Sequence, residues 1–175
     1  MLTTLSRAAL ALGLLAAPLA LSAQETDKPK PISEIKATHG AWNIVCATAS
    51  DACAMEQKGQ DAEGKDMLLA RIARIDPRDT PQGTIDTVIT VLVPLGVMLK
   101  PGLGVQIDGG EATRGAFELC DRNGCVLQSP IPAALVASMK KGVAAKFSMV
   151  APPQKEIVVS LSLSGFTAAY NALKK

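Results

Sequence analysis

The sequence is poor in aromatic residues and nearly balanced in charge. Phe, Tyr and Trp make up 3% of its 175 residues, too few for a row of rings that stacks on nucleic-acid bases. Lys and Arg number 18 against 16 Asp and Glu, a formal net charge of +2, which argues against a protein whose main partner is nucleic acid or an anionic membrane. Hydrophobic residues reach 48%, so the chain is not a disordered tail.

Motifs for catalysis are also missing. A hydrolytic triad needs an imidazole base, and His39 is the only histidine, while no Gly-x-Ser-x-Gly elbow is present. Asp108 and Glu111 flank Gly109-Gly110 and resemble a carboxylate pair, but we expect both to be solvated at a hairpin tip. The sequence therefore predicts no catalytic residue, no cofactor and no metal site.

The first residues have the pattern of a secretory signal. Arg7 supplies the positive charge, residues 8–21 form an apolar run, and small residues follow up to position 23. The run is shorter than the roughly 20 residues of a membrane-spanning helix, and no later segment is long and apolar enough to span. We expect residues 1–23 to be cleaved, which places the mature chain in the periplasm, at the cell surface or in the medium.

The rest of the chain is expected to form a flexible leader and one domain. Residues 24–37 are polar and contain prolines, which is typical of a leader. A single domain over residues 38–175 fits the length of the chain.

Four cysteines, an even number, remain in the exported chain: Cys46, Cys53, Cys120 and Cys125. Export permits disulfides, and three pairings are possible. We favour the two local pairs, Cys46–Cys53 and Cys120–Cys125, because each intervening stretch can reverse the chain. A four-cysteine zinc site is the alternative, although the spacings lie at or beyond its usual range. Neither pair has the two-residue spacing of a redox-active motif.

Short segments with alternating apolar residues predict an all-β fold. In the first strand Trp42, Ile44 and Cys46 face inward. Segment 67–75 also fits a helix, but its β-rich surroundings favour a strand, and residues 76–81 read as a turn-rich break. The expected strands lie at 42–46, 67–75, 85–93, 103–108, 113–120, 125–129, 143–149 and 157–163.

Two helices are expected in the C-terminal third. Ser129 is a candidate N-cap for a helix that reaches about Lys141. Ser164 is a candidate cap for a second helix that presents Phe166, Tyr170 and Leu173 on one face. In the strand at 113–120, Phe117 and Leu119 are expected to face inward. The pattern favours an antiparallel β-sandwich of about eight short strands with one or two short helices.

An ordered set of short motifs resembles the invasion-associated locus B family of small exported proteins from Gram-negative bacteria. These motifs are Trp42-Asn43-Ile44-Val45-Cys46 with Cys53, Val93-Pro94-Leu95-Gly96-Val97-Met98-Leu99, Ile107-Asp108-Gly109-Gly110, residues 117–125, and Ser162-Leu163-Ser164-Gly165-Phe166-Thr167. The resemblance implies an extracytoplasmic β-rich domain, in a family that includes members linked to entry into host cells. It implies no catalytic residue.

These features favour an exported, non-enzymatic binding or interaction protein of the bacterial envelope. Its partner would be a protein or an envelope or host-surface component, bound through loops such as 76–82 or 121–124. One alternative is a periplasmic chaperone or assembly factor that uses an open sheet edge. A less favoured alternative is an envelope hydrolase with carboxylates from unpaired strands. The sequence leaves the oligomeric state open.

Overall fold

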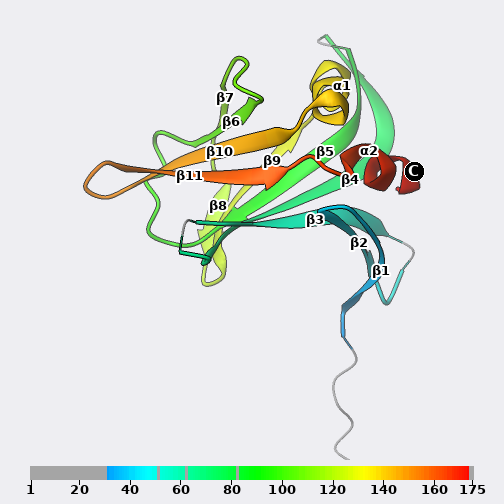
Figure 1. The fold of residues 1–175 in the computed structure, drawn as a ribbon, viewed down its shortest axis with the longest axis horizontal. Helices are drawn as coiled ribbons and strands as arrows, with labels where there is room; N and C mark the ends of the chain where they lie inside the picture. The colour runs from blue at the N-terminus through cyan, green and yellow to red at the C-terminus, as the bar shows by residue number, and fades with distance from the viewer. Residues whose placement is uncertain (1–30, 51, 62, 82, 174–175) are drawn as a thin grey trace, which may run out of the picture. The chain divides into compact units, whose positions relative to one another are not determined.

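The computed structural model of the chain describes residues 31–173 except 51, 62 and 82. The predicted signal at 1–23, and the part of the predicted leader up to residue 30, lie outside the described residues. In the described part, eleven strands form two antiparallel sheets with two short helices (Figure 1). The predicted all-β sandwich class is thereby confirmed, with more strands than the eight expected.

The larger sheet has seven strands in the order β1-β2-β3-β4-β5-β9-β8. Their bounds are β1 Ser33–His39, β2 Trp42–Ala47, β3 Cys53–Gln60, β4 Asp66–Thr80, β5 Gly83–Val93, β8 Leu119–Asp121 and β9 Gly124–Pro130. The smaller sheet has four strands in the order β11-β10-β6-β7. Their bounds are β6 Leu103–Ile107, β7 Thr113–Gly115, β10 Ala144–Ala151 and β11 Lys155–Ser162. Helices α1 (Ala133–Lys141) and α2 (Phe166–Ala172) lie at the same end of the sandwich (Figure 1).

Alternating apolar residues build the core between the two sheets. Trp42, Ile44 and Cys46 of β2 are buried, as predicted from their spacing. From the other sheet, Phe147 and Met149 of β10 are completely buried. A strand exposes successive side chains on opposite faces, so burying one face of each sheet selects this two-residue period.

Strand β4 runs through the segment that was predicted to break the chain. The segment at 67–75 is a strand, as expected, but β4 continues to Thr80 and pairs with β5 beyond residue 76. Its ladder is irregular between Arg74 and Arg78, and this bulge contains Pro77. Proline lacks an N–H for the ladder, and a bulge leaves that position unpaired, so the local turn signal produced a bulge rather than a strand end.

The strand predicted at 113–120 is split between the two sheets. β7 pairs with β6 in the smaller sheet, whereas β8 pairs with β9 in the larger one. Leu119 is 54% exposed, so its predicted inward orientation is wrong. Phe117 lies between the two strands and packs against the core as expected. The chain crosses from one sheet to the other between β7 and β8. The inward–outward alternation of side chains that a single strand would have kept is therefore interrupted before Leu119.

Three predicted boundaries shift because strand pairing extends further than local signals indicate. Part of the predicted leader is strand, since β1 begins at Ser33 and pairs with β2. Ser129 pairs with Ile89 in the ladder of β9 and β5 rather than capping a helix. Helix α1 begins at Ala133, with Pro132 in the N-cap position.

The two sheets are joined at one edge through the peptide group of Ser162 in β11. The side-chain amide of Gln57 in β3 donates from Nε2 to the Ser162 carbonyl oxygen at 2.8 Å, and its Oε1 accepts from the Ser162 N–H at 2.8 Å. The Trp42 Nε1–H donates to the same carbonyl at 3.0 Å. Gly59 of β3 has no room for a side chain, because a Cβ there would overlap Val159 of β11. β3 and β11 therefore lie directly against each other.

A second close crossing fixes the start of α2. The β1–β2 turn at Gly40 passes against the segment that joins β11 to α2, and the Ala41 N–H donates to the Ser164 carbonyl at 3.1 Å. Gly165 has φ 80° and occupies the N-cap position that was predicted for Ser164. A Cβ at Gly165 would overlap the carbonyl oxygen of His39. Only glycine meets both demands, positive φ and close backbone approach.

Helix α2 packs through the face that its spacing predicted. Phe166, Tyr170 and Leu173 are all buried. Phe166 contacts the Trp42 ring edge-on with centroids 5.4 Å apart. The Tyr170 hydroxyl lies 2.6 Å from the Thr87 hydroxyl of β5, so this buried polar pair is satisfied. The C-terminal helix is thus held to strands from both halves of the larger sheet.

Replacing Gly165 by alanine should destabilise the fold far more than replacing Gly109 by alanine. Both glycines have nearly the same positive φ, 80° and 76°, but a Cβ at Gly109 meets nothing within 4 Å. We expect the Gly109 variant to lose about 1 kcal/mol, the cost of the left-handed conformation, and the Gly165 variant to lose several times that amount. Urea unfolding followed by Trp42 fluorescence measures both. Equal losses would show that the crossing at His39 relaxes without cost.

Candidate binding groove beside the Cys46–Cys53 disulfide

The structure contains two disulfides, Cys46–Cys53 and Cys120–Cys125, which are the two local pairs that the sequence favoured. Each joins residues that are directly opposed in an antiparallel ladder, β2 with β3 and β8 with β9. With all four sulfurs paired, a four-cysteine zinc site does not form, and the described residues include no free cysteine.

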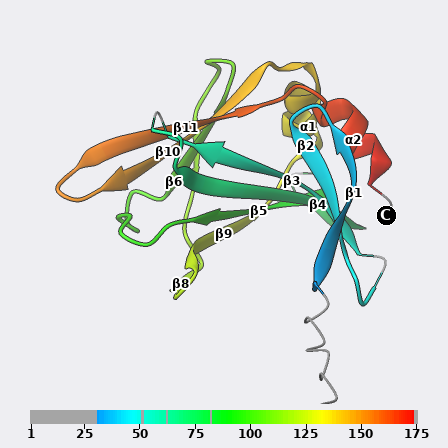
Figure 2. The same ribbon diagram turned by 60° about the horizontal axis from the view of Figure 1, so that its bottom comes forward.

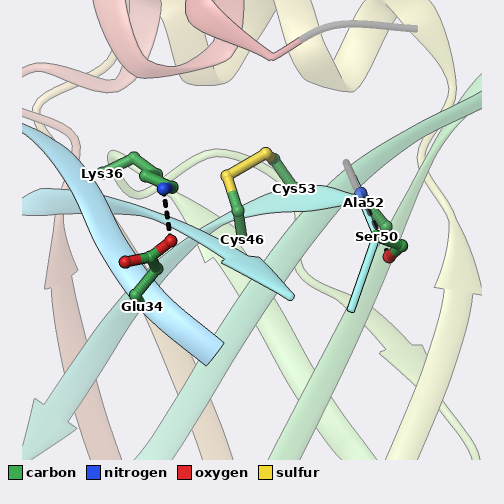
Figure 3. Close-up of a disulfide and its surroundings, with 6 residues drawn as sticks. All are labelled: Glu34, Lys36, Cys46, Ser50, Ala52 and Cys53. Atoms are coloured by element: carbon green, nitrogen blue, oxygen red, sulfur yellow. Dashed lines mark hydrogen bonds and ion pairs between the residues drawn. A yellow bond between two sulfur atoms is a disulfide. The ribbon is translucent and has the colours of Figure 1, made fainter. Parts of the chain in front are cut away.

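A groove of about 660 Å³ lies beside the first disulfide. Figure 3 shows this disulfide with Glu34 and Lys36 of β1 on one side and the turn at Ser50 on the other. The groove is lined by Glu34, Lys36, Ala37, Ile44, Cys46, Ala47, Thr48, Ala49, Ser50, Cys53 and Ala172. Its volume falls within the range of about 300–1,000 Å³ that is typical of ligand sites.

A bulge in β1 brings three of its residues, Glu34, Lys36 and Ala37, to the groove. Glu34 is opposite Cys46, and Ala37 is opposite Ile44, although three positions separate them in β1 and only two in β2. Lys36 is within this irregularity, so the strand alternation restarts after it. Glu34 and Lys36 form an ion pair with both side chains about half exposed. Exposed ion pairs of this kind contribute little to stability. Separating Glu34 from Lys36 to bind a charged ligand group would therefore cost little.

Small side chains leave the groove open. Ala37, Ala47, Ala49 and Ala172 line it, and none reaches beyond its Cβ. The last turn of α2 provides one wall, because the helix lies alongside β1 and β2 (Figure 2). The floor is apolar, with Ile44 6% exposed. A cavity lined in this way suits small apolar groups of a ligand. Its charged side chains, Glu34 and Lys36, lie only at the rim.

The turn that borders the groove is held by several bonds besides the disulfide. The Ala47 N–H donates to the Ala52 carbonyl at 2.9 Å. Thr48 donates from its N–H to the Ile32 carbonyl at 3.0 Å and from its Oγ1 to the Pro31 carbonyl at 2.8 Å. The chain entering β1 is therefore tied to this turn, and the groove keeps its shape without a ligand.

The groove offers few ionisable side chains. Glu34 is the only acidic side chain among the described residues that line it, and Lys36 neutralises this carboxylate. The described residues contain no group of three or more His, Cys, Asp or Glu that could hold a metal ion. His39 pairs with Trp42 in the β1–β2 ladder and does not line the groove.

Asp108 is exposed, as its position at a hairpin tip predicted, yet it is not only a surface charge. Its carboxylate accepts hydrogen bonds from the Val143 N–H at 2.9 Å and from the Ala144 N–H at 2.8 Å. These bonds hold the beginning of β10 against the end of β6. Sequence spacing does not indicate these bonds, because Val143 and Ala144 lie 35 and 36 residues further along the chain. Glu111 is exposed, as expected.

The loops predicted to bind a partner lie elsewhere on the domain. Residues 76–80 belong to the end of β4, and residues 121–124 form the β8–β9 turn, in which Asp121 accepts a bond from the Asn123 N–H at 2.8 Å. Neither loop contributes a residue to the groove. Sequence reasoning missed the groove because alanines carry no chemical signal and β1 was assigned to the leader.

Removing the first disulfide by the double change C46A/C53A should expose the turn at 48–50 to proteases. Limited proteolysis with mass spectrometry should detect faster cleavage between Ala47 and Cys53, while global stability falls by less than about 3 kcal/mol because the closed loop is short. The matched control is C120A/C125A, which should leave this turn protected. Equal cleavage of the turn in both variants would contradict a local role for the first disulfide.

Comparisons with known proteins identify relatives of this chain and a solved structure with a similar fold. Two invasion protein B homologues from strains of Brucella abortus are 29% identical to this chain over 158 residues, covering 88% of it and 87% of each relative. The crystal structure of invasion associated protein b from Bartonella henselae matches with a TM-score of 0.62 at 20% identity, over 77% of this chain and 92% of that one. This last likeness shows the fold alone.

The described residues contain no helix that is long and apolar enough to cross a membrane. Paired cysteines are typical of proteins outside the reducing cytoplasm. The model of the Invasion associated locus B (IalB) family matches residues 42–174, which include both disulfides and helix α2. The chain is therefore a member of the IalB family.

Proposed function

We propose that this protein is a non-enzymatic binding protein of the bacterial envelope and that it holds a partner in the groove beside Cys46–Cys53. The main observation in support of this proposal is a groove of ligand size between a disulfide-bonded turn and the end of α2. The alanine lining and apolar floor suit a partner segment with small apolar side chains. The Glu34–Lys36 pair at the rim suits a charged or polar group that follows this segment.

Membership in the IalB family, which is not a known enzyme family, supports a role without catalysis. A hydrolase would need converging carboxylates in different environments, and the described groove residues offer Glu34 alone. A chaperone that adds a partner strand would need an open, regular sheet edge. Strand β1 is one edge of the larger sheet, and its bulge and its lysine are features that prevent strand addition, while the other edge, β8, is only 3 residues long. Binding in the groove is therefore favoured over both alternatives.

A photoreactive residue at Ser50, on the rim of the groove, should cross-link the partner in living cells. We expect one dominant adduct after irradiation, detected as a mass shift of the purified protein. Adding Ala172→Trp should abolish this adduct, because the indole fills the groove from the end of α2. The matched control is Ala168→Trp, an exposed position one turn earlier in α2 that does not line the groove.

A photoreactive residue at Val143, which is 77% exposed outside the groove, serves as a background. If Ser50 yields no more adduct than Val143, the groove does not hold a partner. The same conclusion follows if the adduct survives Ala172→Trp in a protein whose melting temperature is unchanged.

The location of the partner depends on whether the protein stays in the periplasm or reaches the cell surface. We expect the mature chain to resist added protease on intact cells and to become accessible when the outer membrane is permeabilised, which confines the partner to the envelope. Immunoblotting against a known periplasmic protein and a known surface protein measures this. Digestion on intact cells would instead place the groove at the surface and make a host or environmental component its partner.

A further inference from the structure

The outward face of the seven-stranded sheet carries side chains in rows of alternating character. One row is apolar: Val45 of β2 is opposite Ala54 of β3, and Ala73 of β4 is opposite Val88 of β5. Ala54 of β3 and Ala73 of β4 also lie opposite each other, because in the antiparallel ladder they follow directly on the Met55–Ile72 pair. The register of four adjacent strands thus builds a continuous apolar stripe across the sheet.

The next row on this face is polar. Asn43 is opposite Glu56, Glu56 is opposite Arg71, and Arg71 is opposite Thr90. Within this row Arg71 and Glu56 form an ion pair. Arg71 keeps half of its side-chain surface exposed, whereas Glu56 keeps 16%. The row therefore has one charge of each sign, side by side on the two central strands β3 and β4.

This outer face lies open in the described structure. Both helices pack on the other side of the sheet, where Phe166 contacts Trp42 and Tyr170 contacts Thr87. Shallow hollows remain between the outward side chains, including one of about 380 Å³ that Val45, Ala54 and Ala73 line. Of the apolar row, Ala54 is buried, whereas Val45, Ala73 and Val88 keep part of their surface exposed, and an apolar stripe of this kind is a candidate interaction surface.

The order of residues in the two rows is self-complementary. Rotation by 180° about an axis that runs between β3 and β4, parallel to them, places each row of a second copy over the same row of the first. Because the rotation exchanges β3 with β4 and β2 with β5, Glu56 then faces the second copy's Arg71. The same rotation sets Val45 over Val88. Within these two rows, charges oppose unlike charges and apolar side chains oppose apolar side chains, whereas in the next outward row Lys58 lies over the second copy's Leu69.

We propose that this outer face binds a second copy of the chain, forming a two-fold symmetric dimer with the two seven-stranded sheets packed face to face. Two Glu56–Arg71 pairs then form one four-membered charge network at the centre of the interface. An isologous interface of this kind needs a surface that complements itself under a two-fold rotation, and sheets that pack face to face keep their strands within about 30° of each other. The groove beside Cys46–Cys53 lies on the opposite side of β1 and β2 and is a separate site.

Sedimentation velocity of the disulfide-bonded protein, between about 1 μM and 1 mM, should show a reversible monomer–dimer equilibrium. Val88→Lys should weaken dimerisation by about tenfold or more, since it places a charge in the apolar row. The matched control is Val158→Lys on β11, an exposed valine on the outside of the other sheet, which should leave the equilibrium unchanged.

A charge exchange tests the same geometry without changing the apolar row. Arg71→Glu should weaken the dimer because carboxylates then face carboxylates across the axis, and the double change E56R/R71E should restore it to within about threefold. Near-ultraviolet circular dichroism confirms that each variant is folded.

A protein that stays monomeric throughout the concentration range overturns the proposal and leaves the face to a different partner. A dimer that responds to Val158→Lys, or that ignores both Val88→Lys and Arg71→Glu, also overturns it.

Discussion

The hydrogen bonds to the peptide group of Ser162 are the constraint on which the rest of this domain depends. The end of β11 pairs with β10 on one side, and on its other side, the edge of the smaller sheet, it lies against β3 of the larger sheet without forming a ladder. A buried peptide group without partners costs about as much as a lost hydrogen bond for each polar atom. The Gln57 amide acts in place of a strand backbone, donating to the carbonyl and accepting from the N–H, and Trp42 adds a second donor. The sandwich is closed at this edge by side chains rather than by a ladder.

The position of α2, and with it the candidate groove, follows from that closure. Once Ser162 is held, the next residues pass under the β1–β2 turn, and the backbones approach so closely that both Gly40 and Gly165 are required. The helix that begins there must run along β1 and β2, and its last turn brings Ala172 to the groove. The disulfide fixes the opposite wall. A ligand-sized hollow is thus bordered by segments that a covalent bond and a tight backbone crossing already hold in place, so little ordering is needed when a partner binds.

Strands β2 and β3 supply residues to both proposed surfaces. Cys46 faces the groove, while the adjacent Val45 belongs to the outer face. The same alternation that buries one side of the sheet therefore presents an organised pattern on the other. A shift of the ladder by one residue would exchange these sides, and the Cys46–Cys53 bridge prevents such a shift because it joins directly opposed positions.

Much of this arrangement could be predicted from the sequence, because it rests on local rules. Alternation identified the buried face of β2, helical spacing identified the buried face of α2, and short separations favoured the cysteine pairs that form. The motifs that resemble the IalB family also acquire a physical reason. Trp42 and the Ser162–Phe166 segment are far apart in the chain, yet the indole donates to Ser162 and stacks edge-on against Phe166.

Only the tertiary structure decided which distant segments pair with each other. Local turn signals ended β4 too early, because pairing with β5 continues past the bulge that contains Pro77. Ser129 carried the signal of a helix cap, but its peptide group is used by a sheet ladder. Leu119 was misplaced because it lies beyond a crossing between the sheets, and the hydrogen bonds of Asp108 were missed because their donors lie in a segment 35 residues away. By itself the sequence determined which residues prefer burial and which cysteines can meet. Which strands are neighbours, and hence where a groove or a self-complementary face arises, depends on contacts between segments that no local pattern encodes.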